Sequence, residues 1–439
     1  MKRKRNSLTS EDRQQRQRRK VPRRHARAEA PTTSRRRYSI LKKCLLSASV
    51  IVLALGLCEM GLRVAIWLRS DGAAPLLGRV VSNDEFERPD PILNHVLQAG
   101  CSFIATGSPP GLEYCVSGSI SSQGLNDEEI PLVKPPNEKR VLILGDSFVE
   151  ARQVPRRDNF CSLLERRLSE AAGGPVRVIN AGVSSYSQIL EYLFYKNQLA
   201  QYGADLVIMV FFANDVFDNL RYAKDAVTDE DGVMVAVPPL AAVPWFNFQR
   251  SGVQMEDQQR WEYEDQLRFA NVTTMPWPAS HSYLGSILVT QYRSYSLHRR
   301  FPQPPKNDEF FILEDNPELA FFQNMGWDLT YQYIKLLRDE CAGNGAQLMI
   351  TTAPIASQVY GQTSYDHFFF NGKCTQADQR ELQKISTNLG LKFADTLTPL
   401  KQAGTGLYYP RDGHWTKKGH QVVADALFPQ VRDLLLPKN

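Results

Sequence analysis

Two short motifs, far apart in the chain, together supply the parts of a nucleophilic acyl-transfer site. Gly145, Asp146 and Ser147 follow an apolar run, and Asp412 and His414 stand close to the carboxyl end. A serine hydroxyl is a weak nucleophile, so it needs a base to accept its proton and an acid to orient that base. The two motifs contain these residue types. Each motif alone has another interpretation, as a helix-capping serine or a loop histidine.

The elements that must position these residues are predicted strands. The apolar run before the first motif is typical of a buried parallel strand, which places Ser147 on a strand-to-helix turn. Residues 176–182 and 206–215 contain two further predicted strands, one ending at Gly182 and one near Asn214. Because the carboxyl ends of parallel strands line one crevice, we expect these three residues to converge. The N–H groups of Ser147 and Gly182 and the amide of Asn214 can then stabilise an oxyanion.

The four segments, in this order, resemble the conserved blocks of the SGNH (GDSL-type) hydrolase and acyltransferase superfamily. The resemblance covers residues 140 to 435, most weakly between 219 and 324. It implies a serine esterase or acyltransferase that uses neither a metal nor a cofactor. The site residues that it implies are Ser147, Asp412 and His414 as the catalytic triad and Ser147, Gly182 and Asn214 as oxyanion donors.

The chain departs from the family pattern in two places. The third block usually has glycine two residues before the asparagine, where this chain has Phe212. The acid usually stands three residues before the histidine, but here Arg411 holds that position and Asp412 stands two before. This Asp-x-His-Trp form resembles the ending of membrane-associated polysaccharide O-acetyltransferases, such as alginate acetylation proteins. This ending therefore shifts the expected reaction from plain hydrolysis toward acyl transfer. Asp215 is a rival for the acid, although we expect it to bind backbone N–H groups of its own loop.

Helical patterns that alternate with the strands predict the fold. The pattern indicates an α/β protein with a three-layer, flavodoxin-like, doubly wound parallel sheet. The predicted helices are 158–172, 188–201 and 329–344, the later strands are 346–351 and 391–395, and Thr416 is expected to cap a last amphipathic helix.

The beginning of the chain has a different composition. Residues 1–43 contain 17 Lys and Arg against three acids, a net charge of +14, whereas the whole chain carries +5, which leaves −9 for the remainder. Such a segment is expected to be a disordered, cytoplasmic arm. Residues 44–68 are apolar enough to cross a bilayer, with Glu59 and Arg63 pairing near its surface. A cleaved signal peptide is the alternative to an uncleaved anchor. The positive-inside rule places the large domain outside the cytoplasm, in the periplasm or at the cell surface.

The remaining chain divides into three predicted parts. Residues 69–139 are expected to form a stalk or lead-in, and residues 140–439 the catalytic domain. Within the latter, residues 219–324 form an insertion rich in aromatic residues, whose rings can stack on sugars or form the insertion's own core. If the domain is exported, Cys101 and Cys115 are the best candidates for a disulfide.

Three classes of function remain open. The first is a membrane-anchored serine esterase or O-acyltransferase acting on acylated extracytoplasmic substrates, such as cell-envelope glycans. The second is a non-catalytic carbohydrate-binding or assembly protein on the same scaffold. The third is nucleic-acid binding by the basic arm. Anionic lipid headgroups are the favoured partner of this arm instead, because it lies beside a membrane anchor. No nucleic-acid partner is therefore expected.

Overall fold

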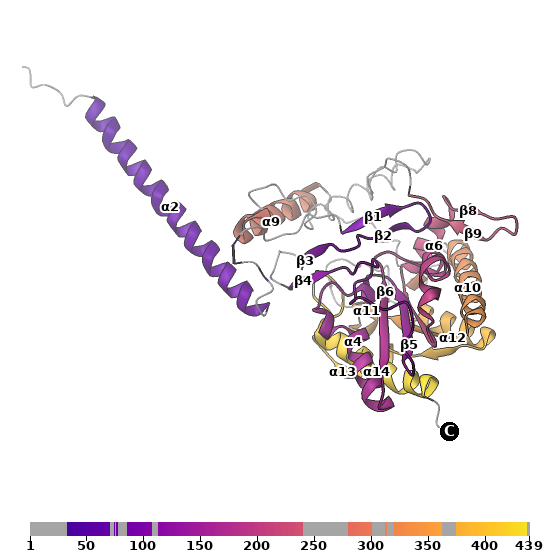
Figure 1. Ribbon diagram of the computed structural model, residues 1–439. Coiled ribbons are helices and arrows are strands. Elements are labelled where there is room, and N and C mark those ends of the chain that lie inside the picture. Colours follow the sequence, from indigo (N-terminus) through magenta and orange to yellow (C-terminus); the bar gives the residue numbers. More distant parts are fainter. Residues whose placement is uncertain are drawn as a thin grey trace, which may run out of the picture. The chain divides into compact units, whose positions relative to one another are not determined.

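The structure, a computed structural model, describes residues 33–70, 74, 76–77, 86–107, 113–239, 280–300, 312–313, 320–361 and 375–436. The chain divides into two units, residues 1–58 and 59–439. The second unit is built around a five-stranded parallel sheet with strand order β11-β10-β7-β5-β6 (Figure 1). In chain order this is the 2-1-3-4-5 arrangement of flavodoxin-like sheets, so the predicted fold class is confirmed. The strands are β5 (Lys139–Gly145), β6 (Val176–Gly182), β7 (Leu206–Phe212), β10 (Gln347–Ala353) and β11 (Lys392–Ala394).

Helices cover both faces of this sheet, which explains why its central strands are continuously apolar. All seven residues of β7 are buried, as are the last six of β5. Helices α4 and α14 pack together on one side, while α5, α6 and α10 pack together on the other (Figure 1). Their bounds are Phe160–Ala172 for α4, Gln188–Phe194 for α5, Asp215–Ala223 for α6, Ala320–Gly343 for α10 and Lys417–Leu435 for α14. Thr416 caps α14, as predicted.

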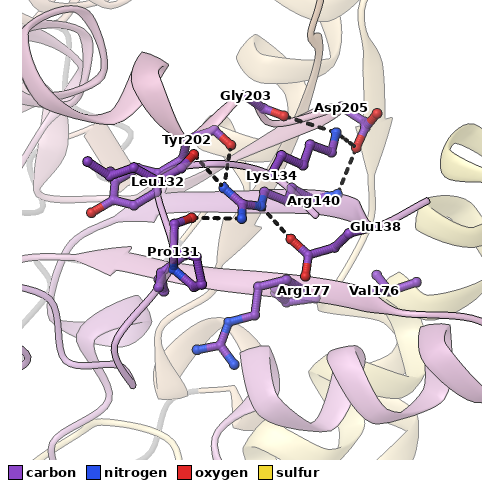
Figure 2. A network of polar contacts seen from close by, with 12 residues as sticks. Pro131, Leu132, Lys134, Glu138, Arg140, Val176, Arg177, Tyr202, Gly203 and Asp205 are labelled. Atoms are coloured by element: carbon purple, nitrogen blue, oxygen red, sulfur yellow. Dashed lines mark hydrogen bonds and ion pairs between the residues drawn. The ribbon is translucent and has the colours of Figure 1, made fainter. Parts of the chain in front are cut away.

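The end of the sheet opposite the predicted site contains a buried arginine (Figure 2). Arg140 is completely buried at the start of β5, and its guanidinium pairs with Glu138 at 2.6 Å and donates to the carbonyl of Tyr202 at 2.8 Å. Its backbone N–H donates to Asp205, which also pairs with Lys134 at 2.6 Å. A buried charge is tolerated only when it is paired in this way. The network thus joins β5 to the chain entering β7.

The other elements follow the predicted alternation with shifted boundaries. A 3₁₀ turn (Arg156–Asp158) precedes α4, so this helix begins later than expected, whereas α10 begins nine residues before residue 329. Shorter elements are α11 (Ala356–Tyr360), α12 (Ala377–Leu389) and α13 (Leu397–Ala403). Within the predicted insertion, the structure describes β8 (Val227–Thr228), β9 (Met234–Ala236) and α9 (Tyr283–Arg300). Its residues 240–279, with Trp245, Trp261 and Trp277, lie outside the described residues.

Residues 86–119 of the lead-in pack against the central sheet. Residues 86–119 form two hairpins, β1 (Glu87–Asp90) with β2 (Asn94–Leu97) and β3 (Ser102–Thr106) with β4 (Cys115–Ser119). Leu93, Leu97 and Phe103 are buried in the same hydrophobic core as the central sheet. These apolar side chains pack beside the central sheet and share its core, so residues 86–119 belong to the same compact unit.

Helix α2 (Thr33–Arg69) contains the predicted membrane span. Its part from Tyr38 to Arg69 is long and apolar enough to cross a membrane. The helix begins before residue 44. Residues 33–43 are therefore helical, whereas the sequence predicted that they would be disordered. The first 32 residues of the predicted basic arm lie outside the described residues.

The expected disulfide is absent from the described hairpin. Cys101 and Cys115 are not joined. The register of β3 and β4 pairs Cys115 with Thr106, so Cys101 lies at the opposite end of the hairpin. Five residues of strand span roughly 16 Å, more than twice the Cα separation that a disulfide bridges.

Candidate active site

The nucleophile region is a tight turn from β5 into a short helix. Helix α3 (Ser147–Glu150) starts directly after Asp146, whose carboxylate accepts the N–H of Phe148 at 2.9 Å. Ser147 therefore occupies the first helical position, where a backbone N–H has no partner inside the helix. In the described part of the chain, no acceptor contacts the N–H of Ser147. The strand end and the cap together fix this residue.

The structure brings the three predicted catalytic residues into one hydrogen-bonded chain. His414 Nε2 lies 2.7 Å from Ser147 Oγ, and His414 Nδ1 lies 2.7 Å from Asp412 Oδ1. The Phe148 ring packs against the imidazole with a centroid distance of 4.8 Å. Trp415, which is completely buried, packs against the same phenylalanine and anchors the loop that carries Asp412 and His414. This arrangement is that of a serine, a general base and its orienting acid.

A residue that the sequence did not single out completes the hydrogen bonding of the acid. The Tyr114 hydroxyl donates to Asp412 Oδ2 at 2.8 Å. The preceding Glu113 accepts the backbone N–H of Arg411 at 2.7 Å, and the Tyr114 ring packs against Tyr409. The start of β4 thus holds the catalytic loop at two points. No sequence motif indicates this contact, because it joins residues almost 300 positions apart.

These contacts shift the pKa values of the acid and the base. Burial opposes ionisation of Asp412, but His414 and the Tyr114 hydrogen bond outweigh it and hold the pKa of Asp412 below its ordinary value. Burial opposes protonation of His414, yet the adjacent Asp412 carboxylate raises the pKa of the imidazole. Burial raises the pKa of Asp146 to about 6. Asp146 also contacts Ser147 Oγ, but at 3.4 Å, so His414 is the closer base.

The geometry does not support the expected oxyanion role of Gly182. Its N–H already donates to Asn180 Oδ1 at 3.0 Å. A Cβ atom at this position would lie 2.1 Å from the backbone nitrogen of Glu150, so glycine is required for the close approach of β6 to α3. In the described loop after β6, the N–H groups of Val183, Ser184 and Tyr186 also have acceptors.

Two other groups remain available as oxyanion donors. The N–H of Ser185 has no acceptor among the described residues, and this residue is held in a left-handed conformation (φ 61°). The side-chain amide of Asn214, at the end of β7, donates one hydrogen to Asp218 at 3.1 Å and has a second hydrogen free. These groups follow the carboxyl ends of β6 and β7.

Asp215 has the structural role that the sequence predicted. Its carboxylate accepts the N–H of Phe212 at 3.0 Å and the side-chain amide of Gln188 at 2.7 Å, and it is buried. Glu191 is buried nearby, and neither of its carboxylate oxygens has a hydrogen-bond partner among the described residues. Burial raises the pKa of both groups well above the ordinary values, and the charges of Glu191 and Asp146 add to the rise for Asp215. Across the described residues, no cluster of His, Cys, Asp or Glu has a geometry that could hold a metal ion.

Comparison with known proteins identifies the family. The model described as GDSL-like Lipase/Acylhydrolase matches residues 141–242, and the model of the SGNH hydrolase-like domain of acetyltransferase AlgX matches residues 323–438. No curated protein sequence matches the chain.

Similar solved structures include three at low sequence identity. The structure of TesA is 14% identical, with 68% of this chain and 100% of that chain covered and a TM-score of 0.34. An acetyl xylan esterase, AlAXEase, is 10% identical, with 66% and 99% covered and a TM-score of 0.34. A lipase/acylhydrolase from Enterococcus faecalis is 10% identical, with 69% and 99% covered and a TM-score of 0.34.

The two family models fall on the two halves of the chain that supply the nucleophile and the base. The first contains Ser147 and the second contains Asp412 and His414. Residues 243–322, between the two models, lie within the range 219–324 where the sequence resemblance was weakest. The chain is thus a member of the SGNH hydrolase superfamily, an ester-acting hydrolase or acyltransferase.

Proposed function

We propose that this protein is a membrane-anchored serine O-acyltransferase or esterase that acts on acylated extracytoplasmic glycans. The observation that carries the catalytic part is the hydrogen-bonded chain Ser147–His414–Asp412, with 2.7 Å at each link. A non-catalytic binding protein on this scaffold would not need a base within hydrogen-bond distance of the serine and an acid oriented by a further hydroxyl.

The geometry supports a two-step reaction. Ser147 Oγ attacks the acyl carbonyl while its proton passes to His414 Nε2, and the imidazolium is stabilised by Asp412. His414 then returns this proton to the departing alcohol as the first ester bond breaks, which leaves an acyl-serine. In the second step His414 takes a proton from water or from a sugar hydroxyl, whose oxygen attacks the acyl-serine. The bond between the acyl carbon and Ser147 Oγ then breaks, and His414 returns its proton to Oγ, which restores the free serine. Water gives free acid, and a sugar hydroxyl gives a new ester.

The oxyanion formed in each step requires donors at the strand ends. We assign this role to the N–H of Ser147 and the Asn214 amide, as the family pattern implies, and to the N–H of Ser185 in place of Gly182. The available hydrogens described above support these assignments. Pre-oriented donors of this kind contribute a large part of catalysis in acyl transfer.

Acyl transfer to an acceptor is supported by the second family model, whose description names an acetyltransferase. A cavity of about 620 Å³ is lined by residues of β3 and β4 together with Asn126, Val154 and Arg156. None of the three triad residues lines this cavity; its link to the nucleophile helix is Asn126, whose side chain donates to the carbonyl of Glu150, the last residue of α3, at 2.7 Å. This volume lies within the range of small-molecule sites and accommodates sugar rings.

Membrane anchoring is supported by the apolar helix α2, and orientation by the basic residues before it. Protease added outside intact cells, or to spheroplasts where an outer membrane intervenes, should digest the domain after Leu68 and spare the arm before Lys43. Protection of the catalytic domain would reverse the proposed orientation.

The catalytic proposal is tested with the full chain in detergent, an acyl-ester donor and candidate glycans. Intact-protein mass should show an acyl adduct on wild-type protein and on Ser122→Ala, an exposed serine outside the site, but none on Ser147→Ala. A glycan ester among the products indicates transfer, and free acid alone indicates hydrolysis. If no adduct forms and Ser147→Ala turns over ester like the wild type, the serine mechanism is refuted.

A further inference from the structure

Helix α9 has a polarity opposite to that of a water-facing surface helix. Leu288, Tyr292 and Tyr295 are 60%, 72% and 64% exposed, and their spacing of four and three residues places them on one face. Ser286 and Thr290, by contrast, are buried. A helix at an aqueous surface normally exposes mainly polar side chains. Although α9 also buries Tyr283 and exposes Gln291, its exposed Leu288, Tyr292 and Tyr295 face suits an environment that is less polar than water.

A second, independent contact ties this helix to the predicted membrane span. Glu59 of α2 directly follows the apolar run, and its carboxylate accepts the N–H groups of Tyr283 and Leu284 at 3.1 and 2.9 Å and the Ser282 hydroxyl at 2.9 Å. Arg63, one turn further along α2, pairs with Glu59 at 2.7 Å. A charged pair near a hydrocarbon core is tolerated when its hydrogen bonds are satisfied in this way. The first turn of α9 is thus fixed where the apolar run ends.

We propose that α9 is an interfacial membrane helix, with its Leu288, Tyr292 and Tyr295 face in the headgroup region of the leaflet nearest the catalytic domain. Tyrosine is enriched at this depth of a bilayer, because its ring is apolar and its hydroxyl is polar. Arg299 is exposed four residues after Tyr295, on the same face, where it can reach lipid phosphates. Helices of this kind bury an apolar face about 5–10 Å deep.

This placement brings the bilayer close to the catalytic loop. Tyr283, in the first turn of α9, packs in a small cluster with Ile66 of α2 and Cys115 of β4. The residue before Cys115 is Tyr114, which donates to the catalytic Asp412. Under the proposed function, the site would then meet an acyl donor or acceptor at the membrane surface. This consequence rests on the proposed catalytic function, whereas the membrane contact of α9 rests only on the proposed anchoring by α2.

The test uses the full chain in nanodiscs of phosphatidylcholine and phosphatidylglycerol. The photoreactive amino acid p-benzoylphenylalanine replaces one residue at a time: Tyr292 on α9, Leu53 inside the apolar run of α2, or Tyr331 on α10. All three side chains are exposed, so each replacement is compatible with the fold. After illumination, mass spectrometry identifies what is attached to the probe. We expect lipid adducts at positions 292 and 53 and no lipid adduct at position 331.

Each other outcome overturns the proposal. Lipid adducts at position 53 without adducts at position 292 would leave α2 in the membrane and α9 outside it. Attachment of the 292 probe to a second copy of the chain would make this face a protein interface. Lipid adducts at position 331 in the same yield as at position 292 would show that lipid contact is unspecific. The absence of lipid adducts at position 53 would show that α2 does not span the membrane. Ester turnover, measured on the same samples, tests the proposed function separately.

Discussion

Replacing Tyr114 with phenylalanine isolates the contact between the lead-in hairpin and the catalytic acid. The hydroxyl donates to Asp412 Oδ2 at 2.8 Å, while Asp412 Oδ1 binds His414. A hydrogen bond to a charged group contributes about 1.5–3 kcal/mol. Loss of this support leaves the carboxylate less firmly oriented, so we expect Tyr114→Phe to lower kcat by about 10- to 100-fold. This loss is smaller than the roughly 10⁴-fold expected for removal of the acid itself.

The same change has a defined effect on pH dependence. Without the Tyr114 hydroxyl, less of the Asp412 charge is neutralised, and the carboxylate attracts the protonated imidazole more strongly. The pKa of His414, already raised by Asp412, should rise further. Because His414 acts as a base only when neutral, the acid limb of the kcat/KM profile should move to higher pH.

The assay measures hydrolysis of a soluble acyl ester by the full chain in detergent, across pH, with thermal unfolding alongside. Tyr409→Phe is the matched control, since its ring packs against Tyr114 but its hydroxyl donates to the carbonyl of Gln153. We expect this control to leave the acid limb in place. The reasoning is refuted if folded Tyr114→Phe keeps the wild-type kcat and pH profile, or if both variants change activity equally.

Three further predictions concern the site and the carboxyl groups beneath it. Ser147→Ala should lower ester turnover by several orders of magnitude, and near-wild-type turnover in folded protein would exclude a serine nucleophile. Asp412→Asn should cut turnover by up to about 10⁴-fold without loss of stability, whereas Asp215→Asn should mainly lower the thermal stability. If Asp215→Asn abolishes turnover in stable protein and Asp412→Asn does not, the two roles are exchanged. Glu191 has a raised pKa in the fold, so its contribution to stability is present below its ordinary pKa of 4.5 and is lost as pH rises. Glu191→Gln should therefore weaken the decline of the unfolding free energy as pH rises above the ordinary pKa of glutamate, and a parallel pH dependence of the unfolding free energy in the two proteins would contradict this.

The fold class and the meeting of Ser147, His414 and Asp412 were predictable because the signals for them are local. A parallel strand that is buried on both faces must be apolar throughout, so residues 141–144 and 206–212 indicated the sheet directly. Parallel strands also end at the same edge, which is why motifs at two strand ends predicted a shared site. The last strand-to-helix boundary was equally local, since Thr416 caps α14 through its own side chain.

The errors arose where a role depends on which hydrogen bonds are already made. Gly182 stands at the expected strand end, but its N–H donates to Asn180, whereas the N–H of Ser185 in the following loop has no acceptor among the described residues. The expected disulfide failed for a related reason. A short loop between Cys101 and Cys115 suggested proximity, whereas the hairpin register separates the two residues along the strands.

The sequence by itself determined that Ser147, His414 and Asp412 meet, because residue type and order along alternating strands and helices restrict where a serine, a histidine and an acid can lie together. Only the tertiary structure decided how the site is supported. Tyr114 reaches Asp412 from a hairpin that neither family model covers, and Glu59 of the apolar helix holds the start of α9. Such contacts join side chains that have no periodic relation in the sequence, and their partners are set by packing of the whole domain.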